Sequence, residues 1–113
     1  MQWMKTAIGR KLRLLGEPAE IIREDGAVWV IALITPVSSL SQAARTALSQ
    51  PDGIYPPGSY EYIGPPEEDI GDCRYIVCGG KRYFVRRAEI HRSGGEEIYC
   101  WGLLLGGGDH EAD

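Results

Sequence analysis

The fold is decided by residues 71–105, which read GDCRYIVCGGKRYFVRRAEIHRSGGEEIYCWGLLL. Three apolar runs rich in β-favouring residues lie within this stretch, at 73–78, 81–90 and 96–105. The glycine pairs Gly79-Gly80 and Gly94-Gly95 separate them. Because glycine accepts the positive φ that two-residue hairpin turns require, each pair predicts a tight turn. The stretch therefore predicts a three-stranded antiparallel meander.

Residues 2–15 predict an amphipathic helix, because Met4, Ile8 and Leu12 recur along one helical face. Gly16 is a typical signal for the end of a helix, and Pro18 prevents the helix from continuing. A helix at a chain end packs either on the sheet of its own domain or on a neighbouring subunit. Both possibilities stay open at this point.

Three more strands are predicted before the meander, at 19–23, 27–35 and 59–63. The second of them reads AVWVIALIT and is apolar on both faces, with Trp29 and Ile31 on one side. Such a strand needs a cover on each face. One cover is the interior of a barrel, and the other is the N-terminal helix or another subunit. We therefore expect a mainly antiparallel all-β domain over residues 1–105, a small barrel or sandwich of about five to six strands with an N-terminal helix.

Residues 37–58 form a long connection after the second predicted strand. Pro51-Asp52-Gly53 and Pro56-Pro57-Gly58 are turn signals within it. Long connections in compact domains are often functional, so we interpret this one as an interaction loop. A plain surface crossover is the alternative. Residues 106–113 are rich in glycine and acidic residues, which predicts a disordered tail.

Composition narrows the class of protein. The chain has 113 residues, 43% of them hydrophobic, which suits one globular domain. Its formal charge of −4 argues against phosphate-backbone binding and against docking on anionic membranes. The longest apolar run, 27–34, is too short to span a bilayer, and no signal-peptide pattern is visible. Three cysteines without an export signal predict reduced thiols in a cytoplasmic setting.

Candidate chemistry is sparse. Cys73, Cys78, Cys100 and His91 are zinc-ligating types, but Cys73 and Cys78 would point to opposite faces of one predicted strand. We therefore expect no metal site and no cofactor. A Cys100–His91 pair would give a small enzyme, yet no orienting carboxylate or oxyanion loop is evident, so we expect no catalytic residues. Gly106-Gly107-Gly108 has no helix after it to bind phosphate, and a linker is the better interpretation.

A barrel that binds single-stranded nucleic acid is the alternative function. Aromatic and cationic side chains interleave on the predicted strands, and such a mixture can stack bases and hold phosphates. The residues concerned are Tyr75, Arg82, Tyr83, Phe84, Arg86 and Arg87. Against this, Tyr83 and Val85 alternate as core residues, and Arg86-Arg87 predicts a β-bulge.

The chain also resembles a known group of proteins. The pattern comprises G-P-P at 64–66, G-D at 71–72, G-G-x-x-Y-x-V at 79–85, A-E at 88–89 and I-Y-x-W-x-L at 98–103. It is similar to small structural proteins from the head–tail joining region of phages and Gram-positive prophages, over roughly residues 10–105. The resemblance implies a head–tail connector, stopper or head-completion protein built as a small β-barrel with a long loop after the second strand.

The same resemblance implies a virion assembly role without enzyme activity. Identical copies would form a ring between the portal side of the capsid and the tail, in the host cytoplasm during assembly and then in the virion. The partners would be portal, adaptor and tail proteins, with DNA passing through the channel without specific binding and with no membrane. In that family the loop, here 37–58, projects towards the channel or an adjacent ring.

Candidate interaction residues follow from the apolar helix face, the second strand, the loop and the basic residues of the meander. They are Trp3, Ile8, Leu12, Trp29, Ile31, Leu40, Pro51, Asp52, Tyr55, Arg82, Arg86 and Arg87. The three arginines are expected to pair with Glu67, Glu68 or Asp69 of a neighbouring subunit.

Overall fold

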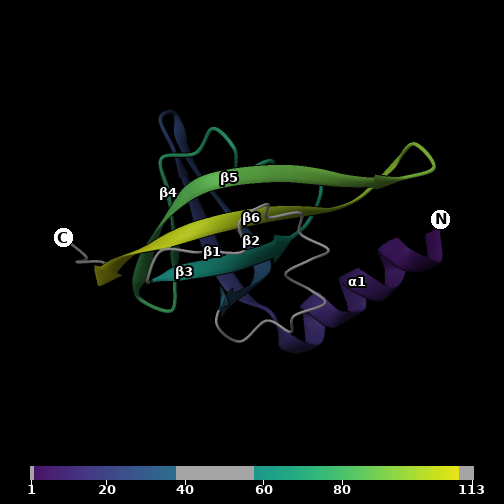
Figure 1. The fold of residues 1–113 in the computed structure, drawn as a ribbon, viewed down its shortest axis with the longest axis horizontal. Helices are drawn as coiled ribbons and strands as arrows, with labels where there is room; N and C mark the ends of the chain where they lie inside the picture. Colours follow the sequence, from purple (N-terminus) through teal and green to yellow (C-terminus); the bar gives the residue numbers. More distant parts are fainter. Residues whose placement is uncertain (1, 38–57, 110–113) are drawn as a thin grey trace.

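A computed structural model describes residues 2–37 and 58–109, with only the backbone described for residues 2–5. One helix precedes six strands (Figure 1). The elements are α1 (Gln2–Leu15), β1 (Glu17–Arg23), β2 (Gly26–Pro36), β3 (Ser59–Gly64), β4 (Tyr75–Cys78), β5 (Lys81–Ser93) and β6 (Glu96–Asp109). The predicted helix has the predicted bounds, and each of the six predicted strands is present with ends shifted by a few residues.

The six strands close into an antiparallel barrel in the order β1-β2-β3-β6-β5-β4. Pairing of β1 with β4, in which Ala19 lies opposite Cys78, completes the circle. The meander β4–β5–β6 is confirmed, with φ of 59° and 76° at Gly79 and Gly80 in its first turn. Both angles lie in the region that β-carbon-bearing residues avoid, so the glycine pairs set the turns.

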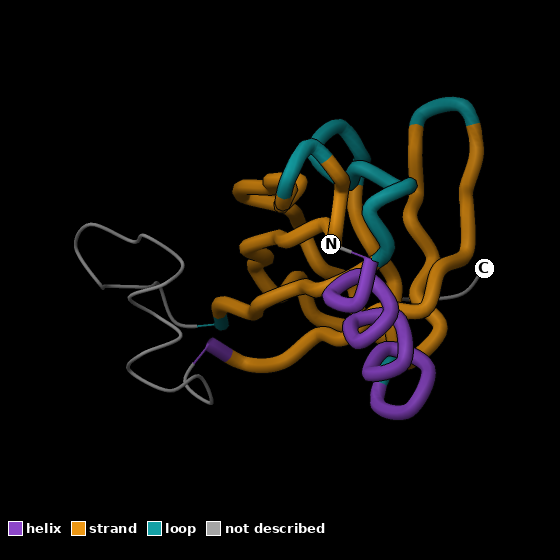
Figure 2. Tube along the Cα trace, turned by 90° about the vertical axis from the view of Figure 1, so that its right-hand side faces the viewer, coloured by secondary structure: helices purple, strands orange, loops and turns teal. Residues whose placement is uncertain are grey.

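Strands β5 and β6 are the longest pair and extend beyond the barrel wall (Figures 1 and 2). A register shift between Val85 and Arg87 places a bulge at Arg86, as predicted. The expected disordered tail is wrong for residues 106–109, which continue β6. The long β5 offers backbone partners that glycine can use without a side chain, and Tyr83 pairs with Gly106. Residues 110–113 lie outside the described part.

The barrel interior is packed with apolar side chains. Those buried to 1% exposure or less in this core are Ala19, Ile21, Ala32, Tyr62, Ile70, Ile76, Cys100 and Leu104. Ile70 comes from the loop between β3 and β4 and plugs the core against Gly102. A β-carbon at Gly102 would lie 2.6 Å from Ile70 Cδ1. Gly64 makes room for the Tyr62 ring in the same way.

The positions of Cys73 and Cys78 relative to β4 (Tyr75–Cys78) differ from the prediction. Cys73 precedes β4 and does not belong to the strand, so the alternation rule does not apply to it. Cys78 is buried in the core, and Cys73 packs against that same core. The prediction that the two thiols point to opposite faces of one strand is therefore wrong. Both behave as small apolar side chains beside one core.

Helix α1 packs on the outside of its own barrel, against β2 and β6. Gly16 is the corner that allows this. Its N–H donates to the Leu12 carbonyl at 2.8 Å, and a β-carbon there would lie 2.8 Å from Ile31 Cγ2. The first of the two possibilities for the helix is therefore realised, because Leu12 is 7% exposed and buried within the subunit.

Candidate interaction site

An apolar cluster covers the outer face of β3 and β6. Val37, Trp101 and Leu103 are buried there, and Ile63 and Tyr99 pack against them. Ile63, Tyr99, Trp101 and Leu103 point away from the barrel interior, because they alternate along β3 and β6 with core residues. The outer face of this part of the barrel is thus a second, smaller core.

A cavity of about 250 Å³ separates α1 from this outer face. Its wall is mostly hydrocarbon and includes one carboxylate, from Glu61 at the centre of β3. The lining residues are Ile8, Lys11, Leu12, Leu33, Glu61, Ile63 and Tyr99. They come from the helix and from the three neighbouring strands β2, β3 and β6, so the cavity exists only because the helix bridges the sheet.

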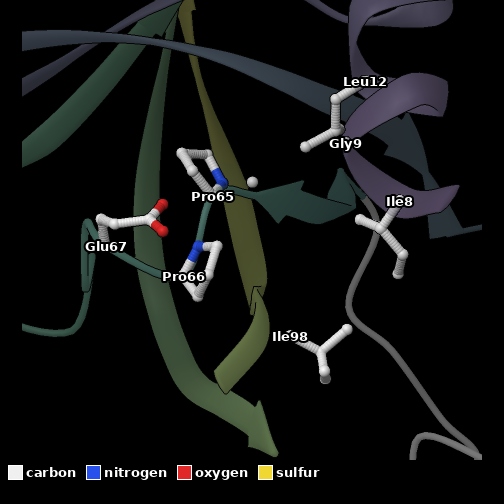
Figure 3. Close-up of a pocket in the computed structure, with 8 residues that line it drawn as sticks. Ile8, Gly9, Leu12, Pro65, Pro66, Glu67 and Ile98 are labelled. Carbon is white, nitrogen blue, oxygen red and sulfur yellow. The ribbon is translucent and has the colours of Figure 1, made fainter. Parts of the chain in front are cut away.

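A smaller cavity of about 140 Å³ lies on another side of the same helix (Figure 3). Figure 3 shows Ile8 and Leu12 on one side of it and Pro65 and Pro66 on the other. It is lined by Ile8, Gly9, Leu12, Gly64, Pro65, Pro66, Glu67 and Ile98. Ile8 and Leu12 line both cavities. This turn of α1 therefore packs on the barrel but leaves a cavity on each of two sides.

Glu61 is half-buried and accepts a hydrogen bond from the indole N–H of Trp101 at 3.1 Å. Burial raises the pKa of its carboxyl above the ordinary value, and the indole bond opposes that rise. Burial also raises the pKa of the neighbouring Tyr99 phenol, and the charges of Glu61 and Glu89 act in the same direction. The outer face therefore contains an acid held where its ionised form is disfavoured.

Tyr99 also contacts β5. Its ring stacks on His91, with centroids 4.5 Å apart, and its hydroxyl lies 3.2 Å from His91 Nδ1. Glu89 approaches His91 Nε2 at 3.8 Å and accepts a hydrogen bond from Arg87 at 3.0 Å. A chain of polar contacts thus runs along the outer face of β5 beside the apolar cluster.

A strip of exposed apolar side chains extends from the end of α1 onto β2. Its members are Leu14 (76% exposed), Leu15 (58%), Ile31 (42%) and Trp29 (64%). Gly16 joins the two halves, since it follows Leu15 and packs against Ile31. We call these four residues the apolar strip. The strand side of it was predicted, whereas Leu14 and Leu15 were not named as interaction residues.

The other predicted interaction residues on the helix and in the loop do not form part of the apolar strip. Ile8 is half-buried and lines both cavities, and Leu12 packs within the subunit. The side chain of Trp3 lies outside the described part of the chain. The remaining predicted residues of the loop also lie outside it, namely Leu40, Pro51, Asp52 and Tyr55.

Two of the three arginines find partners within the described part of the chain. Arg82 lies over the Tyr75 ring at 4.9 Å, and Arg87 pairs with Glu89. Arg86 is exposed at the bulge.

Within the subunit, Arg23 contacts the loop that carries the expected acids Glu68 and Asp69. Its guanidinium donates to Glu68 at 3.3 Å and to the Asp69 carbonyl at 2.7 Å. It also pairs with Asp72. Arg23 thereby fastens the 68–72 loop that carries the Ile70 plug. An open cavity of about 600 Å³ lies beside it and is lined by Arg23, Glu24, Asp25 and Asp72. Its cationic residue, Arg23, is already paired with Glu68 and Asp72.

Cys100 and His91 are not brought together. Ile90 lies opposite Cys100, and His91 lies opposite Tyr99, so the two side chains point to different faces of the sheet. Burial raises the pKa of the Cys100 thiol, as it does for Cys73 and Cys78. These thiols therefore resist forming the nucleophilic thiolate. Among residues 2–37 and 58–109 no group of three or more His, Cys, Asp or Glu is placed to hold a metal ion.

Comparisons with protein-family models, with curated proteins and with solved structures find no match to this chain. In the described part, no helix is long and apolar enough to cross a membrane.

Proposed function

We propose that this chain is a non-enzymatic structural subunit that assembles with identical copies into a ring at the head–tail interface of a phage or prophage particle. The observation that carries the proposal is the apolar strip. Contiguous exposed apolar surface is a mark of protein interaction sites. Trp29 is the strongest single indication, since a mostly exposed tryptophan on a regular strand is the type of residue that dominates interface energies.

The phage setting comes from the sequence resemblance described above. Under this proposal the partners are portal, adaptor and tail proteins, and the segment 37–58 contacts the next ring. The subunit would act in the host cytoplasm during assembly and remain in the virion. A net charge of −4 suits a channel component that lets DNA pass without gripping it.

The test measures assembly in solution. Light scattering and native mass measurement follow the full-length chain over a concentration series, alone and with a portal or adaptor protein. We expect rings, either spontaneously or on addition of the portal. The double variant Leu15→Ser with Trp29→Ser should remain monomeric in both conditions. Phe84→Ser is the matched control, because Phe84 is 41% exposed but lies outside the apolar strip.

Two results would contradict the proposal. One is a wild-type chain that stays monomeric at all concentrations and binds neither portal nor adaptor. The other is assembly that the apolar-strip variant retains in full. A circular dichroism spectrum identical to the wild type confirms that the variant is folded.

A second candidate function has one observation in its favour. Tyr75, Arg82 and Phe84 gather on the outer face of β4 and β5, with the Tyr75 and Phe84 ring centroids 6.2 Å apart. Aromatic rings beside an arginine form a stacking platform for single-stranded nucleic acid. Tyr83, which belongs to the same predicted set of six residues, is instead buried in the core. Fluorescence titration with oligonucleotides at low salt separates the two functions, because tight and salt-sensitive binding would favour this one.

A further inference from the structure

The Glu61 carboxylate occupies an unusual position for an acid on the outside of a barrel. It is half-buried beneath α1, and in the described part of the chain its hydrogen-bond donor is the indole of Trp101. A carboxylate has room for about four hydrogen bonds. Burying it without a cation is unfavourable, because the lost hydration is not replaced. The position is therefore suited to a positive charge from outside.

The cavity beside Glu61 has apolar walls that suit an alkyl chain. Ile8, Leu12, Leu33 and Ile63 supply hydrocarbon walls, and the volume is about 250 Å³. Lysine and arginine stems pack along such walls while their charged heads reach a polar group. Lys11 lines the same cavity, but in the described part of the chain no ion pair joins it to Glu61, and its side chain is exposed.

We infer that the Glu61 cavity is a binding site for an alkyl cation, occupied on assembly by an arginine or lysine side chain of a second copy of this chain. The identity of the occupant rests on the proposed function, whereas the chemistry of the site does not. The described surface offers exposed basic side chains for the role, on the helix at Arg10 and Arg13 and at the bulge of β5 at Arg86.

The Trp101 indole is a built-in reporter for the site, because its N–H donates directly to Glu61. The chain has three tryptophans, so Trp3→Phe and Trp29→Phe variants assign the third indole signal in a ¹H–¹⁵N spectrum. Butylguanidinium is the probe, and butylurea is its neutral control of the same shape. We expect a saturable shift of the Trp101 indole signal with butylguanidinium and none with butylurea.

Glu61→Gln keeps the size of the side chain and removes its charge. Its affinity for butylguanidinium should fall by about tenfold or more, as expected for loss of a charge-assisted hydrogen bond. Glu24→Gln is the matched control, since Glu24 is an exposed acid in the β1–β2 turn. Equal shifts with butylurea, or unchanged affinity in Glu61→Gln, would overturn the cation site. A dispersed indole signal shows that each variant is folded.

A second arm tests the occupant. The Trp101 signal is followed as wild-type protein is concentrated, or assembled on portal protein, and butylguanidinium is then added as competitor. We expect assembly to shift the signal and the competitor to weaken assembly, with neither effect in Glu61→Gln. If the chain assembles normally as Glu61→Gln, the inference fails while the proposed function stands. If butylguanidinium binds but no assembly occurs, a second copy is excluded as the occupant.

Discussion

The two faces of β6 show different solutions to burial. Facing inward, Cys100 and Leu104 belong to the apolar core, and Gly102 leaves space for Ile70 from the loop between β3 and β4. Facing outward, Trp101 is equally buried, yet its indole N–H donates to the Glu61 carboxylate, which lines the cavity beside α1. The inner face is packed for stability, whereas the outer face retains polar chemistry and empty space. Burial alone therefore does not identify a residue of the barrel core.

Overfilling the inner face is expected to have the largest effect. Gly102→Val places new carbon atoms against Ile70, since even a β-carbon would lie 2.6 Å from Ile70 Cδ1. The free energy of unfolding should fall by about 3 kcal/mol, as overpacked cores lose stability through strain. Urea denaturation measures the loss. Gly9→Ala is the control, because its β-carbon meets only ordinary contacts and alanine favours the helix, so that variant should be as stable as the wild type or more so.

Separating the helix from the outer face should have a smaller effect. A β-carbon at Gly16 would lie 2.8 Å from Ile31 Cγ2 and 2.5 Å from the Leu12 carbonyl oxygen. Gly16→Ala should therefore move α1 away from the sheet and lower the free energy of unfolding by about 1–2 kcal/mol. Limited proteolysis would then cleave within the helix while the barrel survives. Resistance equal to that of the wild type would show that the corner tolerates a side chain.

The acid of the outer face predicts a pH dependence of stability. Burial raises the pKa of Glu61 in the folded state, so the folded chain holds this proton more tightly than the unfolded chain. Its stabilising contribution is fully present below the ordinary value of 4.5 and is lost as pH rises through the folded pKa. Lys11 and Tyr99 are the titratable groups that share its cavity.

Glu61→Gln should remove this part of the pH dependence. Chemical denaturation between about pH 4 and pH 7 should give a shallower decline for the variant than for the wild type. Above the folded pKa the variant should be at least as stable. Parallel curves for the two proteins would show that the carboxylate is hydrated as freely in the folded state as in the unfolded one.

The smallest expected effect on the isolated subunit belongs to the apolar strip. Trp29→Ser should change the free energy of unfolding by within about 0.5 kcal/mol, because Trp29 is 64% exposed and lies outside both cores. Thermal denaturation of the monomer measures this. A loss as large as that of Gly102→Val would place Trp29 in the fold of the subunit and not on its interaction surface.

Much of the fold was predictable because its signals are local. The positive φ angles of the turns required glycine pairs such as Gly79-Gly80, and the bulge at Arg86 followed from two adjacent arginines. The candidate site was predicted only in part. Trp29 and Ile31 stood out as surplus apolar residues, while Leu12 was a candidate interaction residue and is buried within its own subunit. The pairing partner of a helix face is not encoded in its periodicity.

Glu61 was missed although its neighbours were visible. In SYEYI the two tyrosines mark the inner face, so alternation places Glu61 outside, where acids are ordinarily solvated. Glu61 is half-buried only because α1 and Trp101, which are far apart in the sequence, pack beside it in the folded chain. A signal did exist in Trp101, whose buried indole N–H needs an acceptor.

The helix, the strands and the glycine turns could be predicted from the amino-acid sequence, because these depend on side-chain periodicity and backbone freedom over a few residues. The tertiary structure alone decided that β1 pairs with β4, that Ile70 plugs the barrel and that β6 continues through glycines to Asp109. It also decided that α1 and the outer face of the sheet form a half-open cavity lined in part by Glu61. These features join residues far apart in the chain, and their free energies appear only when the whole barrel closes.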